Sequence, residues 1–248
     1  MDRVRFIAAW LASLVYWVVG GTLFWVLCVI LLVGVRDRRR SARIGQLALK
    51  CAFRGFIRLL VAFRAVECTY AGFAELRAQT GRLIIAPNHP ALWDAVFVLA
   101  EVEPSACVLK ASLMANPVLR GGVNAAGFIP NKPVHRMLRR CVEVLRDDER
   151  LLFFPEGTRT RREENCVNDF NLGLAVIARQ SEAPVWPIFV ETDSAYLRKG
   201  WPLWRLPPRK VHLRLTVGTP VTYASYGNAQ SFMTALRNQY IDFLQGTA

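Results

Sequence analysis

Residues 83–94 read LIIAPNHPALWD, an apolar strand that gives way to the start of a helix. The strand ends at Pro87, and Pro90 suits the first turn of a helix, where a missing backbone N–H is tolerated. The residue before a proline avoids helical geometry. We therefore expect His89 in the turn between strand and helix, facing outward, with Asp94 a little over one helical turn later.

The alternation of strand and helix continues along the chain from about residue 66. Further apolar strands are predicted at residues 107–109, 151–154, 185–190 and 211–217. Apolar side chains at helical spacing predict helices over residues 134–147 and 229–244. This order indicates an α/β fold with a central, mostly parallel sheet flanked by helices.

The N-terminal part of the chain differs from the rest. Residues 6–35 carry no charge and are largely apolar, and a membrane span needs only about 20 apolar residues. Gly20 and Gly21 lie in the middle, so the run can be one tilted helix or a shallow helical hairpin. We expect a membrane anchor with a basic interfacial helix over residues 1–65, and the globular domain over residues 66–248.

A cluster of arginines comes directly after the apolar run, at Arg36, Arg38, Arg39, Arg40 and Arg43. Positive charge beside a membrane segment favours a cytoplasmic location for the part of the chain that carries it. We therefore expect the protein at the inner (cytoplasmic) membrane, with its site on the cytoplasmic face.

Residues 44–64 have the pattern of a basic amphipathic helix, in which Lys50, Arg54 and Arg58 recur every four residues. Such a helix can lie in the headgroup layer of a membrane, with its cations on lipid phosphates. A surface helix packed on the globular domain has the same pattern, and the sequence leaves that alternative open.

The chain is strongly basic, with a formal net charge of +13 over 248 residues. This balance implies an anionic partner: nucleic acid, an anionic membrane surface or a phosphorylated substrate. The sequence contains no nucleic-acid-binding motif, so nucleic acid is not expected as a partner. The six cysteines include no CxxC pair, which favours reduced thiols over disulfides or a metal site.

His89 and Asp94 have the residue types of a catalytic pair. The Asp94 carboxylate can hold one imidazole nitrogen so that the other accepts a proton. No nucleophile elbow such as GxSxG accompanies them, and the pair therefore fits direct attack by an external hydroxyl. Two alternatives remain open: attack by water, which would make the protein a thioester hydrolase, and a helix-capping histidine beside a solvated aspartate.

A second candidate segment, residues 153–160, reads FFPEGTRT and also comes after an apolar strand. Gly157 permits close approach of the backbone to a ligand. Arg159 offers a planar fork of donors for phosphate or carboxylate, with Arg161 and Arg162 nearby. The alternative is a simple turn with a surface salt bridge between Glu156 and Arg159.

Residues 89–94 resemble the HxxxxD motif of glycerolipid acyltransferases, the lysophosphatidic-acid acyltransferase (PlsC-like) family. Residues 154–159 resemble its FPEGTR motif, residues 127–130 resemble a degraded GxxFxxR block, and residues 183–188 resemble its proline-bearing strand. Lys110 stands where the family often has a lysine. The resemblance covers about residues 66–220, and four ordered blocks make it more specific than any one block.

The resemblance implies an activity and a role for each matching residue. The enzyme would move a fatty acyl group from acyl-CoA or acyl-carrier protein onto a hydroxyl of a lyso-lipid acceptor, in particular 1-acyl-sn-glycerol-3-phosphate. His89 would be the general base and Asp94 would orient it. The acceptor head group would be bound by Glu156, Gly157, Thr158 and Arg159. No metal or bound cofactor is expected.

One departure from the family pattern concerns the acceptor. The GxxFxxR block normally ends in an arginine that helps to bind phosphate, whereas this chain has Pro130 and Asn131, followed by Lys132. Either Lys132 or a nearby arginine replaces it, with Lys110 as a further candidate cation, or the acceptor is a non-glycerol or specialised lyso-lipid.

Overall fold

The structure is a computed structural model that describes residues 2–161, 166–202, 205, 207 and 209–246. Its described part contains a seven-stranded sheet in the order β1-β7-β6-β2-β5-β3-β4. The strands are β1 (Val66–Ala71), β2 (Leu83–Pro87), β3 (Ser105–Leu109), β4 (Ile129–Pro130), β5 (Arg150–Leu152), β6 (Val185–Thr192) and β7 (Val211–Val217). The β6–β7 pair is antiparallel and the other pairs are parallel, so the mostly parallel sheet is confirmed.

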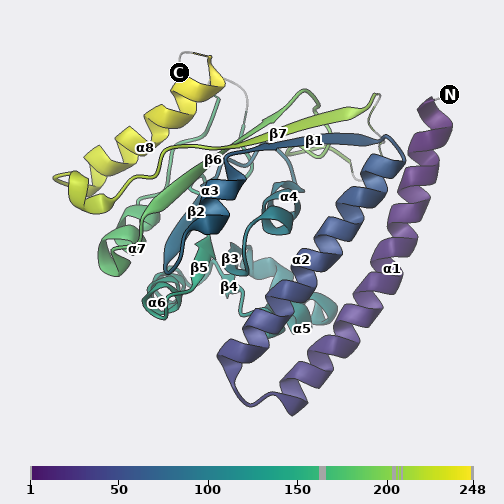
Figure 1. Cartoon of the computed structure of the whole chain (residues 1–248), viewed down its shortest axis with the longest axis horizontal. Helices are drawn as coiled ribbons and strands as arrows, with labels where there is room; N and C mark the ends of the chain where they lie inside the picture. The colour runs from purple at the N-terminus through teal and green to yellow at the C-terminus, as the bar shows by residue number, and fades with distance from the viewer. Residues whose placement is uncertain (1, 162–165, 203–204, 206, 208, 247–248) are drawn as a thin grey trace.

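Helices cover both faces of the sheet (Figure 1). They are α1 (Asp2–Gly34), α2 (Arg38–Ala62), α3 (Phe73–Ala78), α4 (Asp94–Glu101), α5 (Pro117–Ala125), α6 (Val134–Arg146), α7 (Gly173–Ser181) and α8 (Ala229–Leu244), with short 3₁₀ turns η1 (Ala111–Ala115) and η2 (Tyr223–Ser225). β2 is buried along its whole length. Ile84 and Ala86 pack with α6, α7 and α8, while Leu83 and Ile85 pack with α2, α3 and α4.

The predicted strands are present, with two changes near the site. β5 ends at Leu152, because Phe153 and Phe154 already lead into the next loop. The helix that we expected to begin at Pro90 begins only at Asp94. Residues 88–93 form a tight turn instead, and Asp94 therefore lies in the first turn of α4 rather than beyond it.

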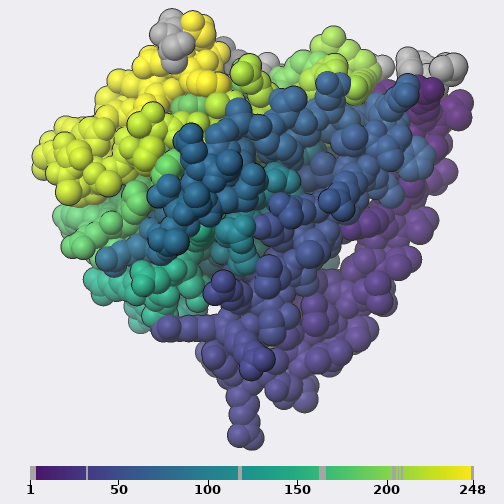
Figure 2. Space-filling view, viewed as in Figure 1, coloured from purple at the N-terminus to yellow at the C-terminus, as the bar shows by residue number. Residues whose placement is uncertain are grey.

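α1 is one continuous helix that passes through Gly20 and Gly21, so a hairpin within residues 6–35 is the wrong alternative. The helix is long and apolar enough to cross a membrane. It runs beside α2 over much of its length and also contacts α5 (Figures 1 and 2). Tyr16 fixes this packing, because its hydroxyl donates to the carbonyl of Ala52 at 2.6 Å.

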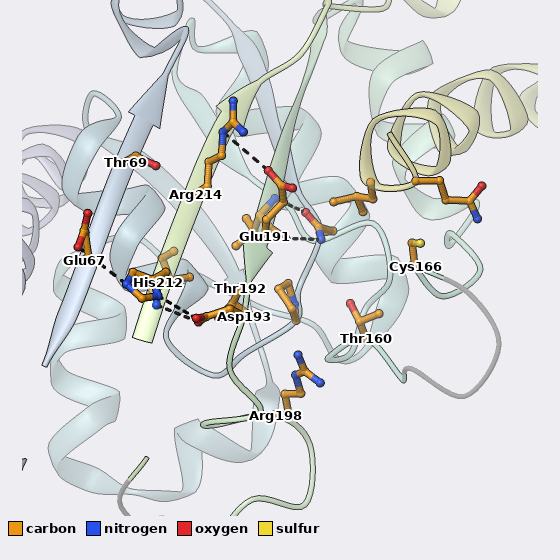
Figure 3. Close-up of a pocket in the computed structure, with 16 residues that line it drawn as sticks. Glu67, Thr69, Thr160, Cys166, Glu191, Thr192, Asp193, Arg198, His212 and Arg214 are labelled. Atoms are coloured by element: carbon orange, nitrogen blue, oxygen red, sulfur yellow. Dashed lines mark hydrogen bonds and ion pairs between the residues drawn. The ribbon is translucent and has the colours of Figure 1, made fainter. Parts of the chain in front are cut away.

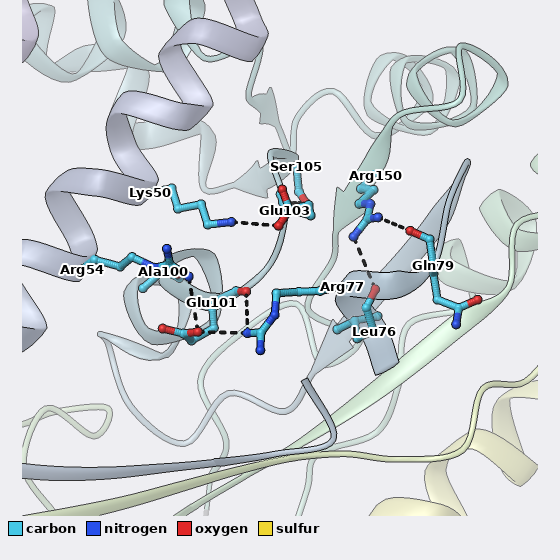
Figure 4. Close-up of polar contacts among 10 residues, drawn as sticks. All are labelled: Lys50, Arg54, Leu76, Arg77, Gln79, Ala100, Glu101, Glu103, Ser105 and Arg150. Carbon is cyan, nitrogen blue, oxygen red and sulfur yellow. Dashed lines mark hydrogen bonds and ion pairs between the residues drawn. The ribbon is translucent and has the colours of Figure 1, made fainter. Parts of the chain in front are cut away.

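Two of the three cations in the basic stripe of α2 contact the globular domain (Figure 4). The Lys50 ammonium lies 3.1 Å from a Glu103 oxygen, and Nε of Arg54 donates to the Ala100 carbonyl at 2.7 Å. Arg58 is exposed. The prediction that Lys50 and Arg54 contact lipid phosphates is therefore wrong, because the carboxyl end of α4 attracts these cations.

α2 also contributes to the core of the globular domain. Phe56, Ile57 and Leu60 belong to the same buried cluster as Phe97 and Val98 of α4. The apolar core therefore crosses the boundary that we expected between residues 65 and 66. The packed α/β unit begins with α2, and α1 lies against it.

Candidate active site

The turn after β2 is held to the neighbouring strand β6 by Asn88. The buried Asn88 amide donates to the Val190 carbonyl at 3.0 Å and accepts from the Val190 N–H at 2.6 Å. This pair of hydrogen bonds replaces the strand pairing that stops at Pro87. The backbone therefore leaves the sheet at a fixed point, and His89 comes directly after it.

His89 and Asp94 face each other across this turn. Nδ1 of His89 lies 2.9 Å from Oδ2 of Asp94, and the same oxygen accepts the Ala91 N–H at 2.7 Å. Asp94 is 1% exposed, whereas the His89 side chain is 18% exposed. When Nδ1 carries the proton and donates it to Asp94, Nε2 keeps its lone pair and can accept a proton.

Burial raises the pKa of the Asp94 carboxyl, because a charge in the interior loses its water. The hydrogen bond and charge of His89, the Ala91 N–H and the field of Arg159 oppose that rise. Among the described residues, Oδ1 of Asp94 has no hydrogen-bond partner. The His89 imidazole is therefore the main group that stabilises an ionised Asp94.

Glu156 joins the two motifs. Its Oε1 accepts the His89 N–H at 2.8 Å and the Thr160 hydroxyl at 2.8 Å, while Oε2 accepts the Asn168 N–H at 2.9 Å. The Thr160 N–H in turn donates to the His89 carbonyl at 2.8 Å. Burial raises the pKa of Glu156, and these donors oppose the rise. We expected Glu156 to contact the head group, but both of its oxygens are engaged within the protein.

Gly157, Thr158 and Arg159 lie on the open side of the loop. Gly157 has a φ of 63°, which favours glycine, and both Gly157 and Thr158 are exposed. Nη1 of Arg159 donates to the carbonyls of Leu197 and Arg198, at 2.9 and 3.1 Å. Nε and Nη2 of Arg159 have no hydrogen-bond partner among the described residues, so Arg159 retains donors for a ligand. Arg162 lies outside the described residues.

The ring of Phe154 packs on the imidazole of His89, with centroids 4.2 Å apart and planes tilted by 31°. Phe154 lies two residues after the end of β5, the strand that pairs with β2. The parallel strands therefore present both rings at one edge of the sheet. This contact restricts rotation of the imidazole and leaves the Nδ1–Asp94 hydrogen bond intact.

Lys110 and Lys132 lie at the same edge of the sheet, after β3 and β4. Asn131 ties these two strand ends together: its N–H donates to the Leu109 carbonyl at 2.8 Å, and its side chain accepts the Ala111 N–H at 2.9 Å. Both lysines are exposed. Within the described ranges, neither ammonium makes an ion pair or contacts the His89–Glu156 site.

A second histidine–carboxylate pair, His212 and Asp193, lines a cavity of about 770 Å³ (Figure 3), and the lining also includes Asn88 and Pro90 of the turn after β2, which we call the catalytic turn because it carries the candidate base. Nδ1 of His212 lies 2.8 Å from Asp193, but its Nε2 lies 3.9 Å from a Glu67 oxygen. The His212 side chain is 52% exposed. His89, unlike His212, is held by the Glu156 carboxylate of the second motif, and we therefore take His89 as the candidate base.

The sequence did not single out several groups that shape the site. Asn88 could have been suspected, because it is a polar residue at the end of a fully apolar strand. Leu197 acts through its backbone: its carbonyl accepts both the Leu92 N–H, at 3.0 Å, and Nη1 of Arg159. Its φ of 61° costs about 1 kcal/mol for a non-glycine residue. A role of that kind leaves no signal in the side-chain pattern.

The acyltransferase family model matches residues 71–191, which include the His89–Asp94 turn and the Glu156 loop. A chloroplastic 1-acyl-sn-glycerol-3-phosphate acyltransferase from Brassica napus is 25% identical over 122 residues, 47% of this chain and 35% of that protein. The 1-acyl-sn-glycerol-3-phosphate acyltransferase of Helicobacter pylori is 28% identical over 116 residues, 44% of this chain and 48% of that protein. The chain therefore spans less than half of the length of either relative.

The fold is that of a solved acyltransferase. The crystal structure of PlsC, the 1-acyl-sn-glycerophosphate acyltransferase of Thermotoga maritima, matches 100% of this chain and 98% of that one, with a TM-score of 0.74 and 19% identity. At this identity the likeness shows the fold, and the acyltransferase family model matches just under half of the chain, including both motifs.

Proposed function

We propose that the protein is an O-acyltransferase that moves a fatty acyl group from a thioester onto the free hydroxyl of 1-acyl-sn-glycerol-3-phosphate. The observation that carries this proposal is the 2.9 Å contact between Nδ1 of His89 and Asp94, which leaves Nε2 as the base. The matching relatives are named for the same acceptor, which favours lysophosphatidic acid over other lyso-lipids.

The reaction needs no protein nucleophile. Nε2 of His89 takes the proton from the acceptor hydroxyl as its oxygen attacks the thioester carbonyl, and Asp94 stabilises the imidazolium that forms. The tetrahedral intermediate collapses when the carbon–sulfur bond breaks. The proton on Nε2 then passes to the leaving thiolate, and His89 returns to its starting state.

Glu156 acts in this scheme as a positioning residue. Its carboxylate would repel a phosphate, and it already accepts three hydrogen bonds, including the His89 N–H. Head-group binding is assigned to Gly157 and Thr158, which are exposed, and to the unused donors of Arg159. An arginine fork matches a phosphate in both charge and geometry.

The donor is acyl-CoA or acyl-carrier protein, since both present an acyl thioester on a carrier soluble in water. Either carrier is anionic, and the chain's net charge of +13 favours its approach. The transfer itself uses only the donor, the acceptor and groups of this chain.

Membrane association is inferred from α1. Its outward side exposes a long series of large apolar residues, among them Val4, Leu11, Val15, Val18 and Leu23. We place this side in the lipid phase of the inner membrane, with the arginines of residues 36–43 at its anionic cytoplasmic surface. The catalytic turn would then lie at the cytoplasmic face.

The test compares purified wild-type protein with His89→Ala in mixed micelles. The acceptor is lysophosphatidic acid, and the donor is either long-chain acyl-CoA or acyl-carrier protein loaded with a long acyl chain. Mass spectrometry should find phosphatidic acid from the wild type and none from His89→Ala. Release of free fatty acid without phosphatidic acid would identify a hydrolase instead. Turnover of His89→Ala near the wild-type rate would exclude the mechanism.

A further inference from the structure

An apolar groove lies between the amino-terminal half of α1 and the globular domain. It has a volume of about 310 Å³. α1 lines one wall, and the other wall comes from the α2–β1 corner, the catalytic turn and the segment after β6. We call it the α1 groove; its main lining residues are Trp10, Leu14, Trp17, Leu92, Trp93 and Tyr196.

One end of the α1 groove reaches the catalytic turn. Trp17 packs on Phe56 with ring centroids 5.0 Å apart, Phe56 packs on Trp93 at 5.1 Å, and Trp93 meets Tyr196 at 5.7 Å. Trp93 directly precedes Asp94 in the turn that also carries His89. A ligand in this groove therefore contacts the same turn that carries His89, the proposed base.

The other end of the groove lies beside Phe6 and Ala65, near the N-terminus of α1. Large apolar side chains in the groove are far from covered: Leu14 is 51% exposed and Leu92 is 42% exposed. Polar lining is sparse, and the Ser13 hydroxyl already donates to the Ala9 carbonyl at 2.6 Å. Such a surface is stabilised by an apolar occupant and not by a charged one.

We propose that the α1 groove binds the single acyl chain of the lyso-lipid acceptor. This inference rests on the proposed function and adds a subsite to it. A methylene group takes up about the space of a water molecule, about 30 Å³ in the liquid, so the groove accommodates roughly ten of them. The remainder of a long chain continues along α1 into the lipid phase. The head group extends from the turn toward Gly157 and Arg159.

The acceptor fits this groove better than the donor does. A lyso-lipid resides in the membrane, and the groove borders the apolar side of α1 that we place there. The donor arrives from water on an anionic carrier, and its acyl chain would have to cross that lipid-facing side. A groove between the anchor helix and the turn lets the acceptor keep its chain in apolar surroundings throughout.

The test narrows the groove at Ser13. Ser13 is buried and lines the groove, and its side chain makes only the local bond to Ala9, so Ser13→Phe places a ring in the groove. The control is Val15→Phe, which adds the same ring at a residue that is 62% exposed and outside the lining. Both variants are checked by thermal melting before kinetics.

The expected result is a change specific to the acceptor chain. In Ser13→Phe, KM for oleoyl lysophosphatidic acid should rise roughly tenfold, the equivalent of about two buried methylene groups. KM for the hexanoyl acceptor and for the donor should stay at wild-type values, as should all values for Val15→Phe. A changed preference for donor chain length, or an unchanged acceptor KM in a folded variant, would overturn the proposal.

A binding measurement separates this inference from the proposed function. The probe is an alkyl lysophosphatidic acid analogue that lacks the reacting hydroxyl, titrated calorimetrically in detergent micelles. Ser13→Phe should bind the long-chain analogue roughly tenfold more weakly than Val15→Phe does. Equal affinities would overturn the groove assignment. Wild-type protein that binds the analogue but transfers no acyl group would refute the proposed function and leave the groove in place.

Discussion

The backbone N–H of His89 donates to Oε1 of Glu156 at 2.8 Å, which joins two motifs that are 67 residues apart in the chain. The bond forms because β2 and β5 are neighbours and parallel, so both loops leave the sheet at the same edge. Glu156 thereby positions the residue that we propose as the base, and its loop leaves Arg159 on the open side.

Replacement of Glu156 by glutamine should lower kcat more than it changes acceptor KM. An amide offers one accepting oxygen where the carboxylate offers two, so at least one buried donor loses its partner, at a cost of about 1–3 kcal/mol. The His89 backbone would then lose its position. Initial rates at varied acceptor concentration give the KM and kcat values, and urea unfolding gives the stability. A raised acceptor KM with unchanged kcat would show that Glu156 binds the head group directly.

Asp94→Asn should reduce kcat at least roughly 10²-fold while the fold persists. The asparagine amide can donate to Nδ1, which would hold the proton on Nε2 and remove the base. His212→Ala is the control, because it removes the other described histidine that pairs with an aspartate. The measurement is the single-turnover rate of acyl transfer at saturating donor concentration for each variant. Loss of activity in His212→Ala with an active Asp94→Asn would transfer the catalytic role to the second pair.

The pH dependence of stability should differ between two carboxylates. Burial raises the folded-state pKa of Glu156 above its ordinary 4.5, so the folded state binds protons more readily than the unfolded state does. Its contribution to stability is therefore greatest below pH 4.5 and falls as pH rises through the folded pKa. The advantage of wild type over Glu156→Gln in unfolding free energy should shrink over that interval.

Glu67 supplies the opposite sign. Its hydrogen bond and ion pair with Lys210 lower its pKa below 4.5. Its contribution is therefore present above pH 4.5 and lost as pH falls through the folded pKa. Urea titrations of wild type, Glu156→Gln and Glu67→Gln from pH 3 to pH 7 measure both trends. The Glu67 difference should weaken in high salt, because this carboxylate is exposed to solvent. If the two differences in unfolding free energy from wild type changed in the same direction with pH, the opposite directions of the two pKa shifts would be contradicted.

Lys132→Ala should raise the acceptor KM several-fold and leave the donor KM unchanged. A phosphate monoester carries close to two charges and needs several cationic donors, and Lys132 stands where the family arginine is missing. Arg179→Ala is the matched control. Arg179 is an exposed cation on α7, the helix that leads into β6. It therefore lies near the amino end of β6, whereas Lys132 lies beyond the carboxyl end of β4. If Lys132→Ala has no effect and lysophosphatidic acid is a poor substrate, the acceptor is a different lyso-lipid.

The sequence predicted the sheet and the His89–Asp94 contact because both rest on local patterns. An apolar run followed by proline marks a strand end, and the five-residue spacing places the carboxylate within reach of the imidazole. The roles of Lys50 and Arg54 were not predictable in this way. Their spacing defines one face of α2, but only the tertiary fold brings Glu103 and the carboxyl end of α4 to that face. For the same reason, the sequence could not predict that the Leu197 carbonyl accepts from Arg159 or that Glu156 accepts from the His89 N–H.

Charges on the outward side of α1 should release the protein from membranes without unfolding it. Val15 and Val18 are 62% and 61% exposed, so Val15→Asp with Val18→Asp removes little buried apolar surface. An aspartate placed in the lipid phase costs several times what an apolar residue gains there, and anionic lipid adds repulsion. Co-sedimentation with anionic vesicles should fall at least roughly tenfold.

The control is Val134→Asp, at an exposed apolar position on α6, which should sediment like wild type. Equal binding by the double variant would show that another surface carries the membrane contact. Deletion of α1 would be a poorer test, because it uncovers the apolar surfaces of α2 and α5 that pack against it.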